Sequence, residues 1–214
     1  MMNINKGLLS ILFILPGVLY AEINITSSLD SYEVELGDES IEIKRVQTPN
    51  AKLSGKYAQT NRNCPPFCVQ PMEAAPGVKT VGIYELVNFM QTEYAVGEGI
   101  LIDARTQKTY NAGTIPGSIN ISYNRINRKA GASEREIIDA MEMFGAKKLE
   151  TGWDFSQAAE LILWCNGNWC GLSPAAIRGL LAEGYPAEKL RYFRGGMEDW
   201  LHYGMPVFKA SSIK

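Results

Sequence analysis

The stretch "LILWCNGNWCGLSPAAIRGLLAEG", residues 161–184, predicts a strand, a loop and a helix in immediate succession. Its first four residues are apolar, which is typical of a buried strand. Ser173 predicts a helix N-cap, Pro174 suits the first helical position, and Gly184 predicts the helix end. Cys165 therefore stands where a strand ends and a loop leading into a helix begins.

The same alternation of strands and helices extends over residues 79–210, which we expect to form one α/β domain. Further strands are predicted from the apolar runs at 99–104, 117–122 and 190–195. Helices are predicted from apolar periodicity at 83–90, 133–144 and 197–204. Units of this kind build a mainly parallel sheet with helices on both faces.

The overall composition excludes several classes of function. The chain has 214 residues and a formal net charge of -2, with 46% hydrophobic and 21% charged residues, as in an ordinary globular protein. No basic stripe stands out, so a nucleic-acid partner is not expected. His202 is the one histidine, which excludes most Ser-His and Cys-His catalytic pairs and multi-histidine metal sites.

Residues 1–21 have the pattern of a secretory signal peptide. Lys6 supplies the positive start, a short apolar run follows, and Ala21 supplies the small residue at the expected cleavage site. We therefore expect an exported, periplasmic protein without a membrane partner after cleavage. A membrane anchor that stays uncleaved is the alternative.

Residues 22–78 form an N-terminal extension rather than a separate domain, because they could bury little alone. The stretch "YEVELGDESIEIKRV", residues 32–46, alternates around a Gly-Asp turn and predicts a β-hairpin. The proline-rich stretch "NCPPFC", residues 63–68, predicts an irregular loop.

The four cysteines form two local pairs, Cys64 with Cys68 and Cys165 with Cys170. Export permits disulfides, and four cysteines allow three connectivities. A local Cys64–Cys68 disulfide is one interpretation, and a redox pair that exchanges with Cys165 and Cys170 is another. A metal site built from all four sulfurs is disfavoured by the spacing and by the lack of a nearby histidine.

The loop after Cys165 has the features of an anion-binding cradle. Residues 166–172 contain no proline, so seven backbone N–H groups are available in front of a helix N-terminus. Such donors would lower the pKa of the Cys165 thiol and make it a nucleophile. The predicted cradle consists of Asn166, Gly167, Asn168, Trp169, Gly171, Leu172 and Ser173.

Two segments resemble the two signatures of the rhodanese family: "LIDARTQKTYNAGTIPGSINI", residues 101–121, and the run from Cys165 to Val207. The resemblance implies a sheet of about five parallel strands. It also implies a sulfurtransferase without a cofactor. In such an enzyme Cys165 takes sulfane sulfur from a small donor, such as thiosulfate or polysulfide, as a persulfide and passes it to a thiol acceptor.

The resemblance also suggests supporting residues. Asp103 and Arg105 would organise the active-site loop by hydrogen bonds, or they form only a structural ion pair. Arg194 would face an anionic substrate, or it is a solvated charge at the rim.

Three departures from the family pattern are visible. The spacing from Cys165 to Ser173 is two positions wider than in most related single-domain proteins, and Thr114 replaces a common histidine. Wider loops are associated with phosphatase and arsenate-reductase members, but the loop arginine that those members use is missing here. The third departure is Cys170.

Cys170 leaves three interpretations open. It resolves a persulfide or sulfenate on Cys165, it forms a dithiol switch with Cys165, or it is a small structural residue beside Trp169. The leading hypothesis is an exported sulfurtransferase. The alternatives are a thiol–disulfide protein that exchanges with a redox partner, and a non-catalytic binding module on the same scaffold.

Overall fold

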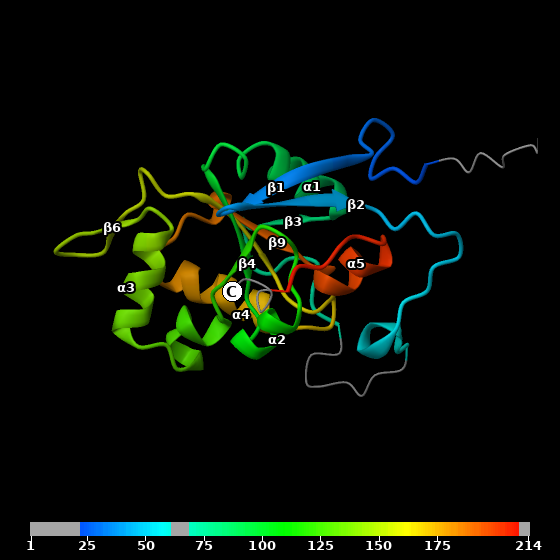
Figure 1. Cartoon of the computed structure of the whole chain (residues 1–214). Coiled ribbons are helices and arrows are strands. Elements are labelled where there is room, and N and C mark those ends of the chain that lie inside the picture. The colour runs from blue at the N-terminus through cyan, green and yellow to red at the C-terminus, as the bar shows by residue number, and fades with distance from the viewer. Residues whose placement is uncertain (1–21, 61–68, 210–214) are drawn as a thin grey trace, which may run out of the picture.

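The computed structural model describes residues 22–60 and 69–209 (Figure 1). Its central element is a five-stranded sheet in which every neighbouring pair is parallel. The strands lie in the order β3 (Lys79–Val81), β9 (Leu190–Phe193), β8 (Glu160–Trp164), β4 (Gly99–Asp103) and β5 (Ser118–Asn120). The predicted α/β class and the parallel sheet are confirmed.

Helices cover both faces of this sheet because successive strand residues point to opposite sides. In β8, Leu161 and Leu163 join one buried cluster, and Ile162 and Trp164 join the other. The first cluster includes helices α3 (Glu134–Met143) and α4 (Leu172–Ala182), and the second includes α1 (Ile83–Gln91) and α5 (Gly196–His202).

The predicted hairpin is confirmed as β1 (Ser31–Leu36) and β2 (Glu39–Lys44), which pair antiparallel outside the central sheet. Val34 and Ile43 are buried in the same cluster as α1 and α5. The Tyr32 hydroxyl also donates to Met90 Sδ of α1, at 3.2 Å. The hairpin therefore packs as an added layer beside α1 (Figure 1).

Several short elements complete the chain. Three short elements do not belong to the central sheet or to the helices named above: α2 (Gln107–Ala112) and the antiparallel pair β6 (Lys147–Lys148) and β7 (Trp153–Asp154). The 3-10 turns are η1 (Gly55–Ala58), η2 (Tyr123–Arg125), η3 (Arg128–Ala130) and η4 (Ala187–Lys189).

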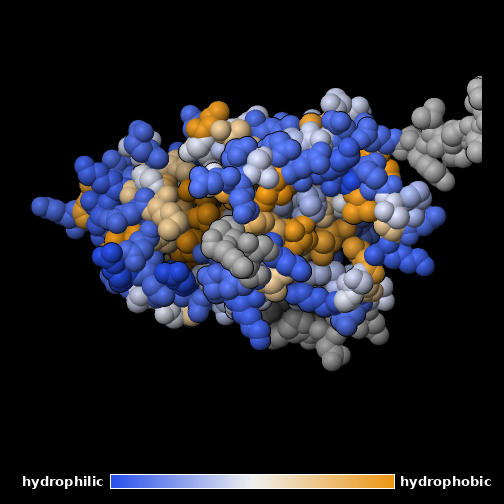
Figure 2. Space-filling view, viewed as in Figure 1, coloured by the Kyte–Doolittle hydropathy of each residue, from blue (hydrophilic) through white to orange (hydrophobic). Residues whose placement is uncertain are grey.

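Figure 2 shows hydrophobic residues across the middle of the viewed face, with hydrophilic residues around them. Among the described residues, no helix combines the length and apolar character needed to span a bilayer.

Local signals at helix ends were predicted with mixed success. Ser133 and Glu136 form the reciprocal capping box at the start of α3. The prediction of Ser173 as an N-cap is wrong, because α4 begins at Leu172 with Gly171 as the capping position. Ser173 instead lies in the first turn of α4, where its hydroxyl donates a hydrogen bond to Cys165 Sγ.

Candidate active site

The cysteine loop connects the carboxyl end of β8 to α4, at the edge of the sheet where parallel α/β proteins place their sites. The first turn of α5 is hydrogen-bonded to the beginning of this loop. The backbone N–H groups of Met197 and Glu198 donate to the carbonyls of Cys165 and Asn166, each at 3.0 Å. Gly196 makes this approach possible, since a Cβ there would lie 2.3 Å from the Cys165 carbonyl oxygen.

Cys165 and Cys170 are free thiols inside this loop, and they are 1% and 4% exposed. The Ser173 hydroxyl donates to Cys165 Sγ at 3.1 Å, and the Cys165 thiol donates to the Cys170 carbonyl at 3.3 Å. Asn166 Nδ2 donates to Cys170 Sγ at 3.5 Å. The loop thus holds two buried thiols, and Cys165 donates to the main chain of Cys170.

The pKa values of the two thiols are shifted in opposite directions. Hydrogen bonds from the Cys165 thiol and from the backbone N–H groups of Asn166 and Leu172 lower the pKa of Cys170 to about 6, against the effect of burial. Burial and the neighbouring Cys170 raise the pKa of Cys165 well above its ordinary value. The expectation of a lowered pKa for Cys165 is therefore wrong, because burial and the neighbouring Cys170 outweigh the hydrogen bonds that Cys165 receives from Ser173.

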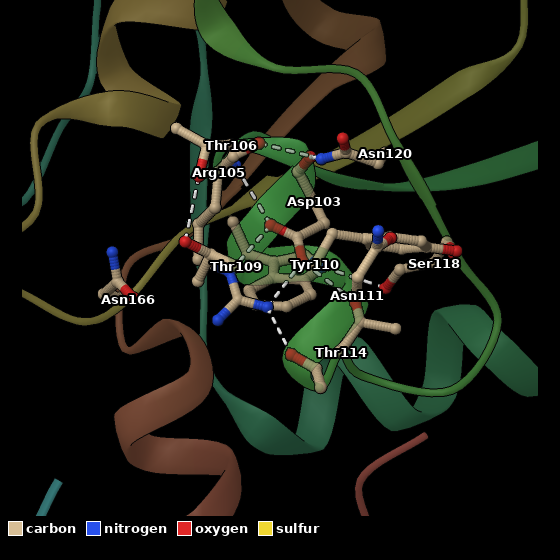
Figure 3. A network of polar contacts seen from close by, with 12 residues as sticks. Asp103, Arg105, Thr106, Thr109, Tyr110, Asn111, Thr114, Ser118, Asn120 and Asn166 are labelled. Carbon is tan, nitrogen blue, oxygen red and sulfur yellow. Dashed lines mark hydrogen bonds and ion pairs between the residues drawn. The ribbon is translucent and has the colours of Figure 1, made fainter. Parts of the chain in front are cut away.

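Asp103 and Arg105, at the end of β4, form a buried ion pair in which Arg105 Nη2 lies 2.6 Å from Asp103 Oδ2 (Figure 3). A second bond from Arg105 Nε to Asp103 Oδ1, at 2.9 Å, makes the pair bidentate. The Thr114 hydroxyl also donates to the Asp103 carboxylate at 2.9 Å, and the Arg105 guanidinium stacks 4.6 Å from the Trp164 ring. Thr114 thus has a role in this network.

The ion pair connects to the cysteine loop through the N-terminal extension. Arg105 Nη1 donates to the Tyr57 hydroxyl at 3.3 Å, and that hydroxyl donates to Asn166 Oδ1 at 3.1 Å. Lys56 Nζ donates to the same oxygen at 3.2 Å. Lys56 and Tyr57 are not among the site residues predicted from the sequence, because nothing in a polar linker indicates which distant loop it will contact.

Arg194 also contacts the extension and is not a simple solvated charge at the rim. Its Nε and Nη2 atoms donate to the Gln70 carbonyl at 3.1 and 2.8 Å, and the Gln70 N–H donates to the Asn168 carbonyl at 2.8 Å. Trp169 Nε1 donates to Glu198 Oε2 at 2.9 Å. The extension and α5 thus fix the loop from outside.

Cys64 and Cys68 lie outside the described residues, and their disulfide stays a prediction. Within the described part of the chain, no three His, Cys, Asp or Glu side chains gather as a metal site requires.

Comparison with known proteins assigns the chain to a family. The family model described as "Rhodanese-like domain" matches residues 85–203, more than half of the chain. A curated relative, the HTH-type transcriptional regulator Rv0324 of Mycobacterium tuberculosis, is 27% identical over 118 residues, which are 55% of this chain. The chain spans only 41% of that relative's length.

Solved structures with a related fold include the human single-domain sulfurtransferase TSTD1, at 23% identity and a TM-score of 0.39, with 58% of this chain and 96% of that chain covered. A thiosulfate sulfurtransferase from Pseudomonas aeruginosa matches at 19% identity and a TM-score of 0.44, with 64% and 21% covered. With the family model on residues 85–203, a five-stranded parallel sheet and a cysteine loop between strand and helix, the chain belongs to the family of proteins with a rhodanese-like domain.

Proposed function

We propose that this protein is a sulfurtransferase that carries sulfane sulfur as a persulfide on Cys165. The observation that carries the proposal is the arrangement of the loop after β8, where Cys165 donates to the Cys170 carbonyl and accepts from the Ser173 hydroxyl, with the Cys170 thiol in the same loop. A buried thiol is a poor nucleophile until a nearby base takes its proton. The Cys170 thiol, whose pKa is lowered by its neighbours, serves as that base in its ionised form.

The chemistry balances without a cofactor. Cys165 transfers its proton to Cys170 and attacks the sulfane sulfur of thiosulfate. An S–S bond forms at Cys165, the S–S bond of thiosulfate breaks, and sulfite leaves with the electron pair. In the second half, the thiolate of an acceptor attacks the outer sulfur of the persulfide and releases the Cys165 thiolate, which regains its proton from Cys170.

The surroundings of Cys165 suit a small donor. Its sulfur is almost completely buried, so a compact anion such as thiosulfate or a polysulfide fits the proposal better than a bulky substrate. The Ser173 hydroxyl, 3.1 Å from Cys165 Sγ, supplies a hydrogen bond to the anion that develops there. Burial also shields a persulfide from water.

The test is mass spectrometry of the fully reduced chain after treatment with thiosulfate or polysulfide. We expect one added sulfur atom on Cys165, located by fragmentation of the peptide that contains both loop cysteines. The adduct should disappear on addition of a thiol acceptor. A reduced chain that gains no sulfur under either donor would contradict the enzyme assignment and favour a non-catalytic binding module.

Thiol–disulfide exchange is a second candidate, favoured by two free, buried thiols within one loop, where Cys165 donates to the Cys170 carbonyl. The Cys170 thiolate would attack a disulfide of a redox partner protein, forming a mixed disulfide and releasing one partner thiolate. Cys165 would then attack the Cys170 sulfur, form the Cys165–Cys170 disulfide and release the second partner thiolate. Such a protein would need both cysteines for every turnover, which a persulfide carrier does not.

Export is part of the proposal. Cleavage after Ala21 would leave a mature chain that begins at Glu22. The intact mass of the protein isolated from its own cells, with its location by fractionation, checks this: the expected product starts at Glu22 in the exported fraction. A full-length chain in the membrane fraction would instead indicate an uncleaved anchor.

A further inference from the structure

The turn η1 of the N-terminal extension lies against the cysteine loop, although 109 positions separate Tyr57 from Asn166. Tyr57 and Lys56 both donate to Asn166 Oδ1, at 3.1 and 3.2 Å. Figure 1 shows the extension leaving β2 and running along the side of the domain to this turn. The extension therefore reaches the loop by specific polar contacts.

Arg105 fixes which atom donates in each hydrogen bond of the chain Arg105–Tyr57–Asn166. Arginine can only donate, so Arg105 Nη1 uses the Tyr57 oxygen as an acceptor, at 3.3 Å. The single proton of the Tyr57 hydroxyl then goes to Asn166 Oδ1. Burial raises the pKa of Tyr57 to about 12, so the hydroxyl keeps this proton throughout the neutral range.

The orientation of the Asn166 amide decides what faces the sulfur. With Oδ1 held by Tyr57 and Lys56, Nδ2 points to Cys170 Sγ, at 3.5 Å. An amide rotated by half a turn would set its carbonyl oxygen against the thiolate, which is repulsive. An N–H donor favours the ionised form of an acidic group, and an oxygen there disfavours it.

We propose that Tyr57 is a positioning residue of the active site, which orients the Asn166 amide so that it stabilises the Cys170 thiolate. The use of that thiolate as a base for Cys165 rests on the proposed function, whereas the orientation itself does not. The N-terminal extension thus contributes a positioning residue to the cysteine loop.

Other ionisable groups act on the same thiol and its partners. Cys165 follows β8, Tyr192 lies in β9, and Asp103 is the last residue of β4, two positions before Arg105. The other charged groups are Lys56 at the Asn166 oxygen, Arg178 and Arg194 around Tyr192, and Glu198 of α5 at Trp169. None of these residues is substituted in Tyr57→Phe, which removes only the hydroxyl that accepts from Arg105 and donates to Asn166.

The test is the pH dependence of iodoacetamide alkylation at Cys170 in the reduced full chain, with fragmentation to separate Cys170 from Cys165. The wild-type midpoint is expected at about 6. Tyr57→Phe keeps the ring and removes the hydroxyl, and we expect its midpoint to rise by about one pH unit. Tyr84→Phe is the matched control, because Tyr84 is 66% exposed on α1, and it should leave the midpoint unchanged.

A double variant tests the route through Asn166. Asn166→Ala should raise the midpoint at least as far as Tyr57→Phe, and the two changes together should raise it no further than Asn166→Ala alone. An unshifted Tyr57→Phe midpoint, or shifts that add in full, would overturn the inference. The readout needs no sulfur transfer, so a chain with the expected midpoints but no persulfide would refute the proposed function alone.

Discussion

Replacing Cys165 with serine is expected to abolish persulfide formation at this position and to lower the rate of sulfur transfer by about 10³-fold or more. The hydroxyl has nearly the shape of the thiol but ionises far less readily and cannot carry sulfane sulfur. Because the change is nearly isosteric and the Cys170 carbonyl and Ser173 hydroxyl remain as hydrogen-bond partners, the fold should survive. The measurements are the sulfur adduct by mass spectrometry and the initial rate with thiosulfate and a thiol acceptor.

The matched variant is Cys170→Ser, which separates the two candidate functions. For a persulfide carrier, Cys165 should still load with sulfur, but about 10²-fold more slowly at neutral pH, because the general base is lost. The rate should recover as the pH rises toward the high pKa of Cys165. Loading that is absent at every pH would favour the thiol–disulfide function. A persulfide on Cys170 in the Cys165→Ser chain would move the carrier role to Cys170.

Replacing Arg105 with alanine is expected to lower the free energy of unfolding by about 3–5 kcal/mol. Arg105 and Asp103 are 1% and 0% exposed, so removal of the guanidinium leaves a carboxylate buried with the Thr114 hydroxyl and the Arg105 backbone N–H as its remaining donors. Most of this loss is the free energy of leaving a buried carboxylate without its counter-charge. It is larger than the net stabilisation that the intact ion pair provides. Urea unfolding at neutral pH measures it.

The control is Arg135→Ala, which removes a solvent-exposed ion pair from α3. Arg135 is paired with Asp139 at 2.9 Å, but its side chain is 80% exposed, so the expected loss is within about 0.5 kcal/mol. If Arg105→Ala cost no more than this control, the buried ion pair would not organise the end of β4. Loss of the Tyr57 contact should also raise the alkylation midpoint of Cys170 in the Arg105 variant.

The elements that the sequence predicted are those with a strong local pattern. The strand before Cys165, the strand at 99–104 and the capping box of α3 all follow from apolar runs or from contacts within one helical turn. The sequence analysis did not predict α2, a short polar helix without an apolar stripe, or β3, an edge strand of three residues. Short elements of this kind form because their neighbours hold them, so their own residues carry little signal.

The sequence by itself determined the α/β class, the place of Cys165 at the end of a strand, and the loop of backbone donors in front of a helix. These features depend on periodicity and spacing within a few residues. Only the tertiary structure decided which thiol ionises first, where the Asp103–Arg105 pair leads, and that Tyr57 reaches the loop. The physical reason is that a pKa depends on burial and on donors brought from distant parts of the chain, and the Tyr57–Asn166 contact joins residues 109 positions apart.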